Sequence, residues 1–254
     1  MKKVDVSIAP AYPAQNFMKP LLRPEPGTAT SIYQQSDMSF ASMMAGSQAD
    51  IETLAPAQSL PAETSLFEQG SMPRDVYFVE RGLVKLIRLE REGQKLIVSL
   101  SSTGGLLGVS SVISQRLHPV SAITLTPCRV RCLPANIMQS LLRANPELSW
   151  RLLQMYSQEY FARVIHLTQL GCLSARQRLE HFLWELALAM DLKTQGTEVR
   201  IVLPLKLGEI ADLLAVTQEH VSRLMKQMQD EGVVRREKGH IIICNLERLR
   251  YSID

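Results

Sequence analysis

Two short helical patterns joined by a tight turn place the strongest constraint on how this chain of 254 residues can fold. In the first pattern, Ile210, Ala211 and Leu214 recur at helical spacing and define one apolar face. Ala215-Val216 then forms a turn, and Thr217 is a natural N-cap for a second helix. The apolar residues of the second helix are expected to point inward: Val221, Leu224, Met225 and Met228. This pattern predicts a helix-turn-helix.

The opposite face of the second helix is polar near its start. Four residues share this face because they fall at positions i, i+1, i+4 and i+5: Gln218, Glu219, Ser222 and Arg223. In a recognition helix, the residues near the N-terminus meet base edges in the major groove of DNA. An arginine can grip O6 and N7 of guanine with two hydrogen bonds, and a carboxylate can accept one from the cytosine amino group. We therefore predict that this helix reads DNA sequence.

The segment from Gly232 to Ile243 reads as a β-hairpin with its turn at Lys238-Gly239, and Asn245 is expected to cap a final short helix. Basic residues in this hairpin follow the second helix directly, where DNA phosphates would lie. Two short helices and a hairpin can also serve as a protein-contact module, but the basic hairpin favours DNA. The predicted DNA-binding residues are Thr217, Gln218, Glu219, Ser222, Arg223, Lys226, Arg235, Arg236 and Lys238.

A long helix is predicted to begin at Asn145-Pro146-Glu147, which supplies an N-cap, a proline at the first helical position and an acid facing the helix dipole. An apolar stripe follows at steps of three and four residues. It can pack on the strands of its own chain or form a coiled-coil seam with a second copy. The residues predicted for such a dimer interface are Leu153, Tyr156, Tyr160, Val164 and Leu167.

Short strands separated by turns dominate the chain from about Leu66 to Leu133. The clearest are Val76–Val79, Leu83–Leu89 and Lys95–Leu100, and Ala122–Leu133 offers a further pair. The turns between the first three contain Gly82 and Gly93, because glycine tolerates the positive φ that tight turns need. Strands of this length and spacing predict a small antiparallel barrel or sandwich.

The predicted organisation has four parts. Residues 1–50 are proline-rich and without periodicity, so we expect a poorly ordered extension with one short helix near Ser39–Leu54. Residues 51–144 form the strand-rich sensor domain, and residues 145–170 form the long helix. Residues 171–254 form the DNA-binding domain, in which Ser174 caps a helix to about Met190 and Val199–Leu203 is a strand.

Composition excludes several classes of function. Residues 171–254 contain 12 Lys or Arg and 12 Asp or Glu, so local placement rather than bulk charge must attract DNA. The four cysteines fit neither a metal spacing nor a disulfide framework and are expected to be buried thiols. No signal sequence or membrane span is apparent, which predicts a soluble cytoplasmic protein without a membrane partner. No nucleophile–base pair, phosphate-binding loop or zinc spacing appears, so we do not expect an enzyme.

The order of strands, long helix and helix-turn-helix resembles the Crp/Fnr superfamily of bacterial transcription regulators over about Leu60 to Leu249. Its most specific motif here is Glu219-x-x-Ser222-Arg223 after Ile210–Leu214. The resemblance implies an α+β fold, with an N-terminal antiparallel β-barrel of the cyclic-nucleotide-binding type, a dimerisation helix and a C-terminal winged helix-turn-helix. It implies a homodimer that binds a palindromic site with TTGAT-like half-sites on double-stranded DNA and contacts RNA polymerase. The catabolite-activator branch usually has arginine where this chain has Gln218.

The resemblance also identifies where a cyclic nucleotide would bind. Members that bind one use a Gly-Glu pair for the ribose and an Arg-Ser or Arg-Thr pair for the phosphate. Val109 stands here in place of that glutamate, and His118-Pro119 stands roughly in place of the second pair. The long helix reads Phe161–Val164 where adenine-binding members have Thr-Ser. We therefore expect no cyclic AMP binding, although Arg116 lies close enough in sequence to serve a shifted loop.

Other cofactors of the family are not expected either. The iron–sulfur branch needs an N-terminal cysteine cluster, and no cysteine precedes Cys128. A haem-binding member needs an axial ligand; His118 or His166 has the right chemistry, but a lone histidine is more often structural. The prediction is a regulator without a cofactor, with response to a cyclic nucleotide, another small molecule or haem as the alternative.

Overall fold

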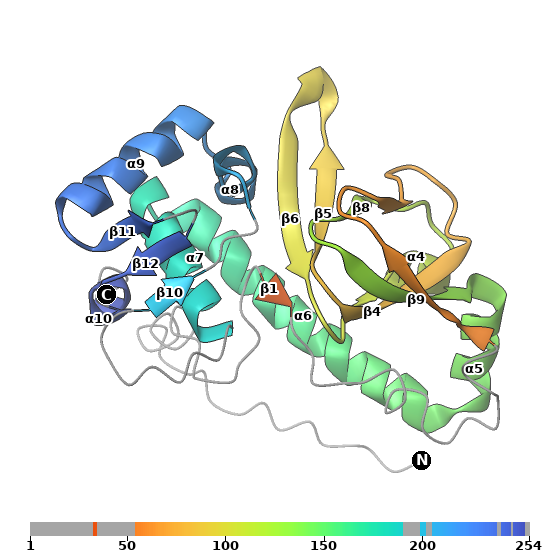
Figure 1. The fold of residues 1–254 in the computed structure, drawn as a ribbon. Coiled ribbons are helices and arrows are strands. Elements are labelled where there is room, and N and C mark those ends of the chain that lie inside the picture. The colour runs from red at the N-terminus through yellow and green to blue at the C-terminus, as the bar shows by residue number, and fades with distance from the viewer. Residues whose placement is uncertain are drawn as a thin grey trace, which may run out of the picture.

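The computed structural model describes residues 33–34, 54–189, 199–201, 205–237, 240–244 and 246–251. The chain forms a strand-rich domain, a long helix and a mixed C-terminal domain, in that order (Figure 1). None of the helices in the described part of the chain combines the length and the apolar character that a membrane crossing requires.

The strand-rich part, which we call the β domain, consists of two sheets packed face to face. Its strands are β2 (Ala57–Leu60), β3 (Ser65–Phe67), β4 (Asp75–Arg81), β5 (Val84–Leu89), β6 (Lys95–Ser101), β7 (Leu106–Leu107), β8 (Ser121–Thr124) and β9 (Cys128–Pro134). The sheet orders are β1-β6-β5-β8-β3, in which β1 is Tyr33–Gln34, and β2-β9-β4-β7. Buried Val84 and Ala122 of one sheet share a core with Val79 and Val130 of the other. The predicted antiparallel barrel is confirmed in type, and the sheets form an open, barrel-like jelly roll.

The turn between β4 and β5 depends on Gly82. Its φ is +103°, and a Cβ at this position would lie 2.5 Å from Cys128 Sγ and 2.7 Å from the carbonyl oxygen of Pro127. Only glycine satisfies both the backbone conformation and the close approach. Cys128 is itself buried in β9, as expected for one of the thiols, whereas Cys172 is exposed.

Two residues of the predicted N-terminal extension have a defined place in the fold. Tyr33–Gln34 form β1, which pairs in parallel with β6 opposite Leu100 and Ser101. An edge strand such as β6 offers free backbone groups to an extended segment. The other residues of the predicted extension, and the helix expected near Ser39–Leu54 apart from Leu54, lie outside the described residues.

Helix α4 (Val109–Ser114) lies within the β domain between β7 and β8, and two helices connect this domain to the rest of the chain: α5 (Ala135–Ala144) and α6 (Pro146–Cys172). The predicted start of α6 is confirmed, because the side chain of Asn145 accepts a hydrogen bond from the backbone N–H of Leu148 at 3.1 Å. Leu148 and Leu152 pack into a core of the β domain. Figure 1 shows α6 running along the β domain and into the C-terminal domain.

The C-terminal domain contains the predicted helices and strands. They are α7 (Ala175–Ala189), β10 (Val199–Ile201), α8 (Leu207–Leu214), α9 (Gln218–Asp230), β11 (Val234–Glu237), β12 (His240–Ile243) and α10 (Leu246–Tyr251). The three strands form one sheet in the order β10-β12-β11. The residues expected to point inward from α9 are buried: Val221, Leu224, Met225 and Met228. The predicted hairpin turn at Lys238-Gly239 and the cap at Asn245 lie outside the described residues.

Candidate nucleic-acid interface

The turn between α8 and α9 sets the direction of the second helix. Ala215 ends α8 in the left-handed conformation with φ +53°, and the backbone N–H of Val216 donates to the carbonyl of Ala211 at 3.1 Å. Thr217 then caps α9, because its hydroxyl accepts a hydrogen bond from the backbone N–H of His220 at 3.2 Å. The predicted helix-turn-helix and its N-cap are therefore confirmed.

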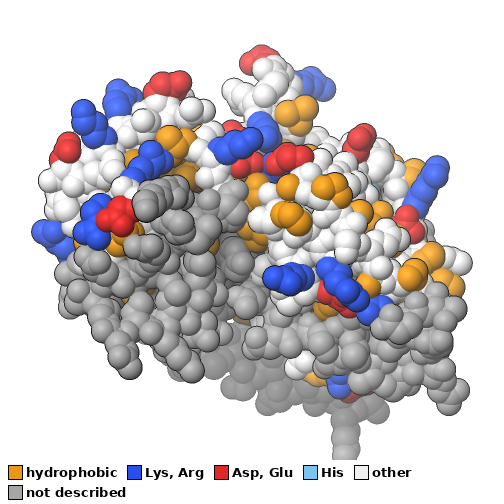
Figure 2. Space-filling view, viewed as in Figure 1, with side chains coloured by type: hydrophobic (Ala, Val, Ile, Leu, Met, Phe, Trp, Pro, Cys, Tyr) orange, Lys and Arg blue, Asp and Glu red, His pale blue; other side chains and the backbone are white. Residues whose placement is uncertain are grey.

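The polar face of α9 lies on the surface of the domain. Its members are all exposed: Gln218, Glu219, Ser222, Arg223 and Lys226. Thr217 at the start of the helix is also exposed. Figure 2 shows acidic and basic side chains interspersed over the region of α9 rather than one patch of a single sign. This surface combines donors and acceptors, which suits the reading of base edges better than a uniformly basic surface would.

Glu219 is held in its charged form at the start of α9. Hydrogen bonds from its own backbone N–H and from the Thr217 side chain lower the pKa of the carboxyl, and the nearby charge of Arg223 lowers it further. An ionised carboxylate accepts hydrogen bonds and donates none. Glu219 is therefore presented as an acceptor next to the donor groups of Arg223.

Gln218 differs from its neighbours on this face because its side chain also lies against α8. A Cβ at Gly208 would lie 3.0 Å from the Gln218 amide oxygen, so Gln218 lies directly over that glycine. A larger residue at position 208 would have to displace Gln218. The spacing along α9 alone did not reveal this contact, because it depends on how α8 crosses α9.

The hairpin beside α9 presents two of the three predicted basic residues. Arg235 and Arg236 lie on β11 opposite Ile242 and Ile241, and both are exposed. Arg235 Nε lies 2.8 Å from a carboxylate oxygen of Glu237. The backbone N–H of Val233 donates to Met228 at 2.9 Å and so ties the hairpin to α9. Lys238 lies outside the described residues.

Most of the apolar stripe predicted on α6 lies on the surface of the single chain. Leu153, Tyr160 and Leu167 are 55%, 67% and 68% exposed, and Val164 is half-buried. Trp150 is 56% exposed and continues the stripe three residues before Leu153, the first residue predicted for it. Large apolar residues exposed in such a row are unusual on an isolated chain. We call the following residues the α6 seam: Trp150, Leu153, Tyr160, Val164 and Leu167.

Tyr156, which is among the residues predicted for the dimer interface, is half-buried on the single chain and is not included in the α6 seam. It packs against the core of its own β domain, and its hydroxyl accepts a hydrogen bond from the Ser110 hydroxyl at 3.0 Å. Helical periodicity alone does not separate Tyr156 from the seam, since it lies about 40° around the helix from Tyr160. The difference is that the β domain of the same chain covers α6 at Tyr156. A stripe drawn by steps of three and four can include residues from both edges of a wide apolar face.

The region where a cyclic nucleotide binds in similar proteins is built here by Gly108, Val109 and His118. His118 is 3% exposed, and its ring stacks on Phe67 with ring centroids 3.9 Å apart. A Cβ at Gly108 would lie 3.4 Å from His118 and 3.6 Å from Phe67, so the stacked pair lies against the backbone that begins α4. Burial lowers the pKa of His118, which keeps the ring neutral near pH 7.

Val109 and Arg116, the other residues singled out in this region, lie in different environments. Val109 is fully buried in a core of the β domain, whereas Arg116 is exposed. His166, the other histidine with haem-ligand chemistry, is buried in α6, and burial is the largest of the effects that lower its pKa to about 4. Within the described ranges, no three His, Cys, Asp or Glu side chains gather as a metal site.

Taken together, a β domain, a long connecting helix and a winged helix-turn-helix with a free polar face define a DNA-binding regulator with a sensor-type domain. Residues 57–145 match the family model of the cyclic nucleotide-binding domain, and residues 177–251 match that of the Crp-like helix-turn-helix domain. The chain belongs to the Crp/Fnr superfamily of transcription regulators.

Individual relatives agree with this assignment. The chain is 26% identical over 229 residues to a probable transcriptional activator of Rhizobium leguminosarum bv. viciae, covering 90% of this chain and 94% of the relative. It is 28% identical over 185 residues to the anaerobic regulatory protein of Haemophilus influenzae, covering 72% and 71%. The solved structure of FixK2 from Bradyrhizobium japonicum has the same fold, with a TM-score of 0.68 at 23% identity over 78% of this chain and 96% of that one. These relatives are regulators, and neither matched family model describes an enzyme.

Proposed function

We propose that this regulator binds a palindromic DNA site as a homodimer, with one α9 in the major groove of each half-site. The observation that carries the proposal is the division of α9 into a buried apolar face and an exposed polar face that begins at its N-cap. Residues at this end of a recognition helix meet base edges. Thr217, Gln218, Glu219, Ser222, Arg223 and Lys226 contact the groove and its rim, and Arg235, Arg236 and Lys238 contact phosphates.

The motif Glu219-x-x-Ser222-Arg223 supports TTGAT-like half-sites, because it resembles the recognition motif of the fumarate–nitrate-regulator branch. Two-fold symmetry of a dimer requires two-fold symmetry of the site. The seam on α6 supports the dimer, because its large apolar side chains are exposed on the single chain.

Selection from a random DNA library tests the proposed site directly. We expect the purified full-length protein to enrich an inverted repeat whose half-sites are centred about one helical turn apart, ~34 Å. Enrichment of a single unpaired half-site would contradict the dimeric reading. Absence of any motif would contradict sequence-specific binding. If a motif is found, mapping of the bound sites across the genome would identify the regulated genes.

The remaining partners follow from this role. A regulator bound at a promoter acts on transcription through RNA polymerase, which we propose as its protein partner besides the second copy. Both the DNA and the polymerase are then in the cytoplasm, which we propose as its location.

We further propose that the β domain does not bind cyclic AMP with regulatory affinity. A cyclic phosphate carries a negative charge, and a guanidinium provides the strong charge-assisted bonds that hold it. The corresponding position here has buried, neutral His118 followed by Pro119, which has no backbone N–H. Val109 cannot accept a hydrogen bond from a ribose hydroxyl, so polar groups of the ligand would remain unpaired at about 1–3 kcal/mol each.

Isothermal titration with cyclic AMP and cyclic GMP is expected to give no binding at micromolar concentration. Specific DNA binding by the same preparation is the control for folded protein. Micromolar binding of either nucleotide that also increases DNA affinity would overturn this prediction and point to Arg116 as the phosphate partner. If neither binds, tight specific DNA binding without an additive favours a constitutively active regulator, and weak binding favours a different effector.

A further inference from the structure

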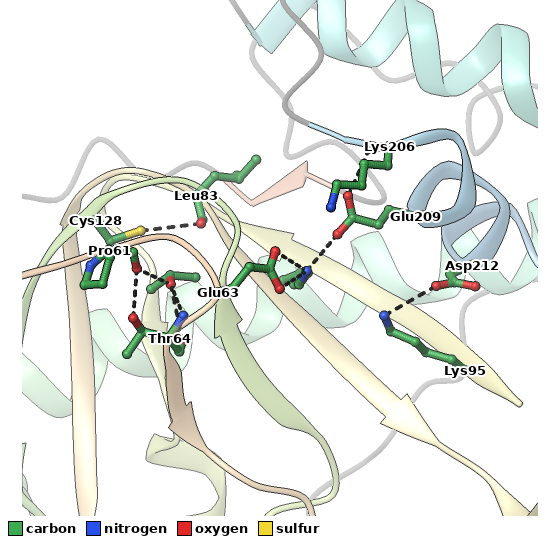
Figure 3. Close-up of polar contacts among 11 residues, drawn as sticks. Pro61, Glu63, Thr64, Leu83, Lys95, Cys128, Lys206, Glu209 and Asp212 are labelled. Atoms are coloured by element: carbon green, nitrogen blue, oxygen red, sulfur yellow. Dashed lines mark hydrogen bonds and ion pairs between the residues drawn. The ribbon is translucent and has the colours of Figure 1, made fainter. Parts of the chain in front are cut away.

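A buried lysine joins the β domain to the first helix of the helix-turn-helix. Lys85 lies on β5 and is 3% exposed. Its ammonium group donates to both carboxylate oxygens of Glu63, at 2.8 and 3.0 Å, and to Glu209 Oε1 at 2.7 Å. Figure 3 shows Glu63 and Glu209 approaching the same nitrogen from opposite sides.

On the DNA-binding side, the contact is fixed to the backbone of α8. Glu209 Oε2 accepts a hydrogen bond from the backbone N–H of Lys206 at 2.9 Å, which caps the start of α8. The other oxygen of the same carboxylate binds Lys85. One side chain therefore holds the first turn of α8 and attaches that turn to the β domain.

On the other side, the contact is fixed to the β domain. Glu63 lies in the turn between β2 and β3, and its backbone N–H donates to the carbonyl of Thr124 on β8 at 2.7 Å. Its φ is +60°, a conformation that residues other than glycine seldom adopt. The strand framework therefore fixes the backbone of Glu63, while its side chain is 61% exposed and its carboxylate reaches Lys85 through both oxygens.

The apolar surroundings hold the same two domains together but do not fix their angle as sharply. A continuous hydrophobic cluster includes Ile87 and Ile97 of the β domain and Ile210 and Leu213 of α8. Apolar packing is non-directional, whereas an ammonium group with three oxygen partners is satisfied in few geometries. A buried salt bridge is weak evidence of added stability, and in some proteins such a contact specifies one arrangement instead.

Lys85 and Glu209 are both charged near neutral pH. Burial lowers the pKa of Lys85, but the hydrogen bonds to Glu209 and Glu63 and their charges outweigh it, and the pKa is raised overall. Burial likewise raises the pKa of Glu209, but the bonds from Lys85 and the Lys206 backbone lower it overall. The contact is therefore lost only as pH falls through the lowered Glu209 pKa or rises through the raised Lys85 pKa.

We propose that Lys85 is a positioning residue that sets which half-site spacing the regulator accepts. In a dimer, the distance and angle between the two recognition helices depend on how each helix-turn-helix is held relative to the two-fold axis. In the proposed dimer, that axis runs along α6. The β domain is attached to α6 by a hydrogen bond from Arg163 Nη1 to the carbonyl of Val98 on β6, at 2.9 Å. Lys85 attaches α8 to the same β domain, and α9 packs against α8.

The inference rests on the proposed function, and DNA spacing gives it a measurable consequence. Each added base pair moves one half-site by about 3.4 Å and rotates it by about 35°. A rigidly held pair of recognition helices matches one spacing, whereas a pair held only by apolar contacts and the α6–α7 connection can follow several.

The experiment compares full-length wild type and Lys85→Met on palindromes with identical half-sites and spacers changed by one or two base pairs. We expect wild type to prefer one spacing over its neighbours by about tenfold or more, equivalent to about 1.4 kcal/mol. Lys85→Met should reduce this preference to about threefold or less, which is under half of that free energy. Discrimination against a changed base within the half-site should stay the same, because α9 is not altered.

A matched control comes from the same interface. Lys95 on β6 lies 3.7 Å from Asp212 on α8, but both side chains are partly exposed. Lys95→Met should keep the wild-type spacing profile, because an exposed pair contributes little. Glu209→Gln is the second test variant, since its amide oxygen can still accept from Lys206 while the charge is removed, and it should broaden the profile as Lys85→Met does.

The outcomes separate the inference from the function on which it rests. A folded Lys85→Met protein with the sharp wild-type profile overturns the role of Lys85 and leaves the symmetric site intact. Wild type that binds every palindrome equally well overturns the inference and leaves the symmetric site intact, whereas wild type that binds a palindrome no better than a single half-site contradicts the proposed function. If Lys85→Met does not fold, the profile of Glu209→Gln decides in the same way.

Discussion

Replacing Arg223 with alanine is expected to weaken specific DNA binding far more than non-specific binding. A bidentate arginine–guanine contact contributes about 1–3 kcal/mol of discrimination. A symmetric dimer makes the contact twice, so the loss is about 2–6 kcal/mol if the two sites add, or on the order of 30-fold and upward in affinity. Non-specific binding depends on phosphate contacts and salt, to which a base-reading arginine adds little.

The position of Arg223 makes this a clean substitution. It is exposed on α9, while Val221 and Leu224 on the other face hold the helix in the domain. Surface substitutions away from the core usually change stability by no more than about 0.5 kcal/mol. A loss of DNA binding would therefore report on the DNA contact rather than on folding.

Mobility-shift titrations at several fixed salt concentrations, with the selected palindrome and with unrelated DNA, measure the effect. The matched control is Arg235→Ala on β11, a proposed phosphate contact. It should weaken binding to both DNAs alike. The slope of log affinity against log salt concentration should fall by about one for each phosphate contact that is lost. Equal losses on both DNAs for Arg223→Ala would make Arg223 a phosphate contact as well.

A glutamate at Tyr160 is expected to abolish the dimer at micromolar concentration. Tyr160 is 67% exposed on the single chain, so the change leaves the fold of each chain intact. If the α6 seam packs about a two-fold axis, the new carboxylate is repeated across that axis and buried without a partner. Burial of an unpaired charge costs several kcal/mol, so association should weaken by about 100-fold or more.

Sedimentation velocity of wild type and variant gives the masses directly. Gln158→Glu is the control, because it adds the same charge at an exposed position of α6 outside the seam. It should sediment as wild type does. A monomeric wild type at micromolar concentration, or a fully dimeric Tyr160→Glu protein, would each count against the seam.

Much of the recognition element follows from local sequence. Thr217 caps α9 because its hydroxyl needs only the backbone three residues ahead. The same holds for Asn145 at the start of α6. The inward and outward faces of α9 follow from helical periodicity, since one face must be apolar to pack against α8. Such features involve residues within about one helical turn of each other, so a single sequence can predict them.

Contacts between distant segments could not be predicted in this way. The stacking of His118 on Phe67 joins residues on different elements, and the sequence showed only that an expected arginine was missing. Tyr156 was assigned to the dimer stripe because periodicity identifies an apolar face but not which part of it the same chain covers. The strand β1 formed by Tyr33–Gln34 depends on a free edge of β6 that only the assembled sheet provides.

The contact of Lys85 with Glu209 is the extreme case, since it joins residues 124 positions apart. Nothing in their local patterns distinguishes Lys85 from any other strand lysine or Glu209 from any other acid in a first helical turn. The sequence by itself determined that a recognition helix exists and which of its faces is polar, because periodicity and capping act over a few residues. Only the tertiary structure decided how that helix is held against the β domain, because burial makes a charge depend on partners that other elements supply.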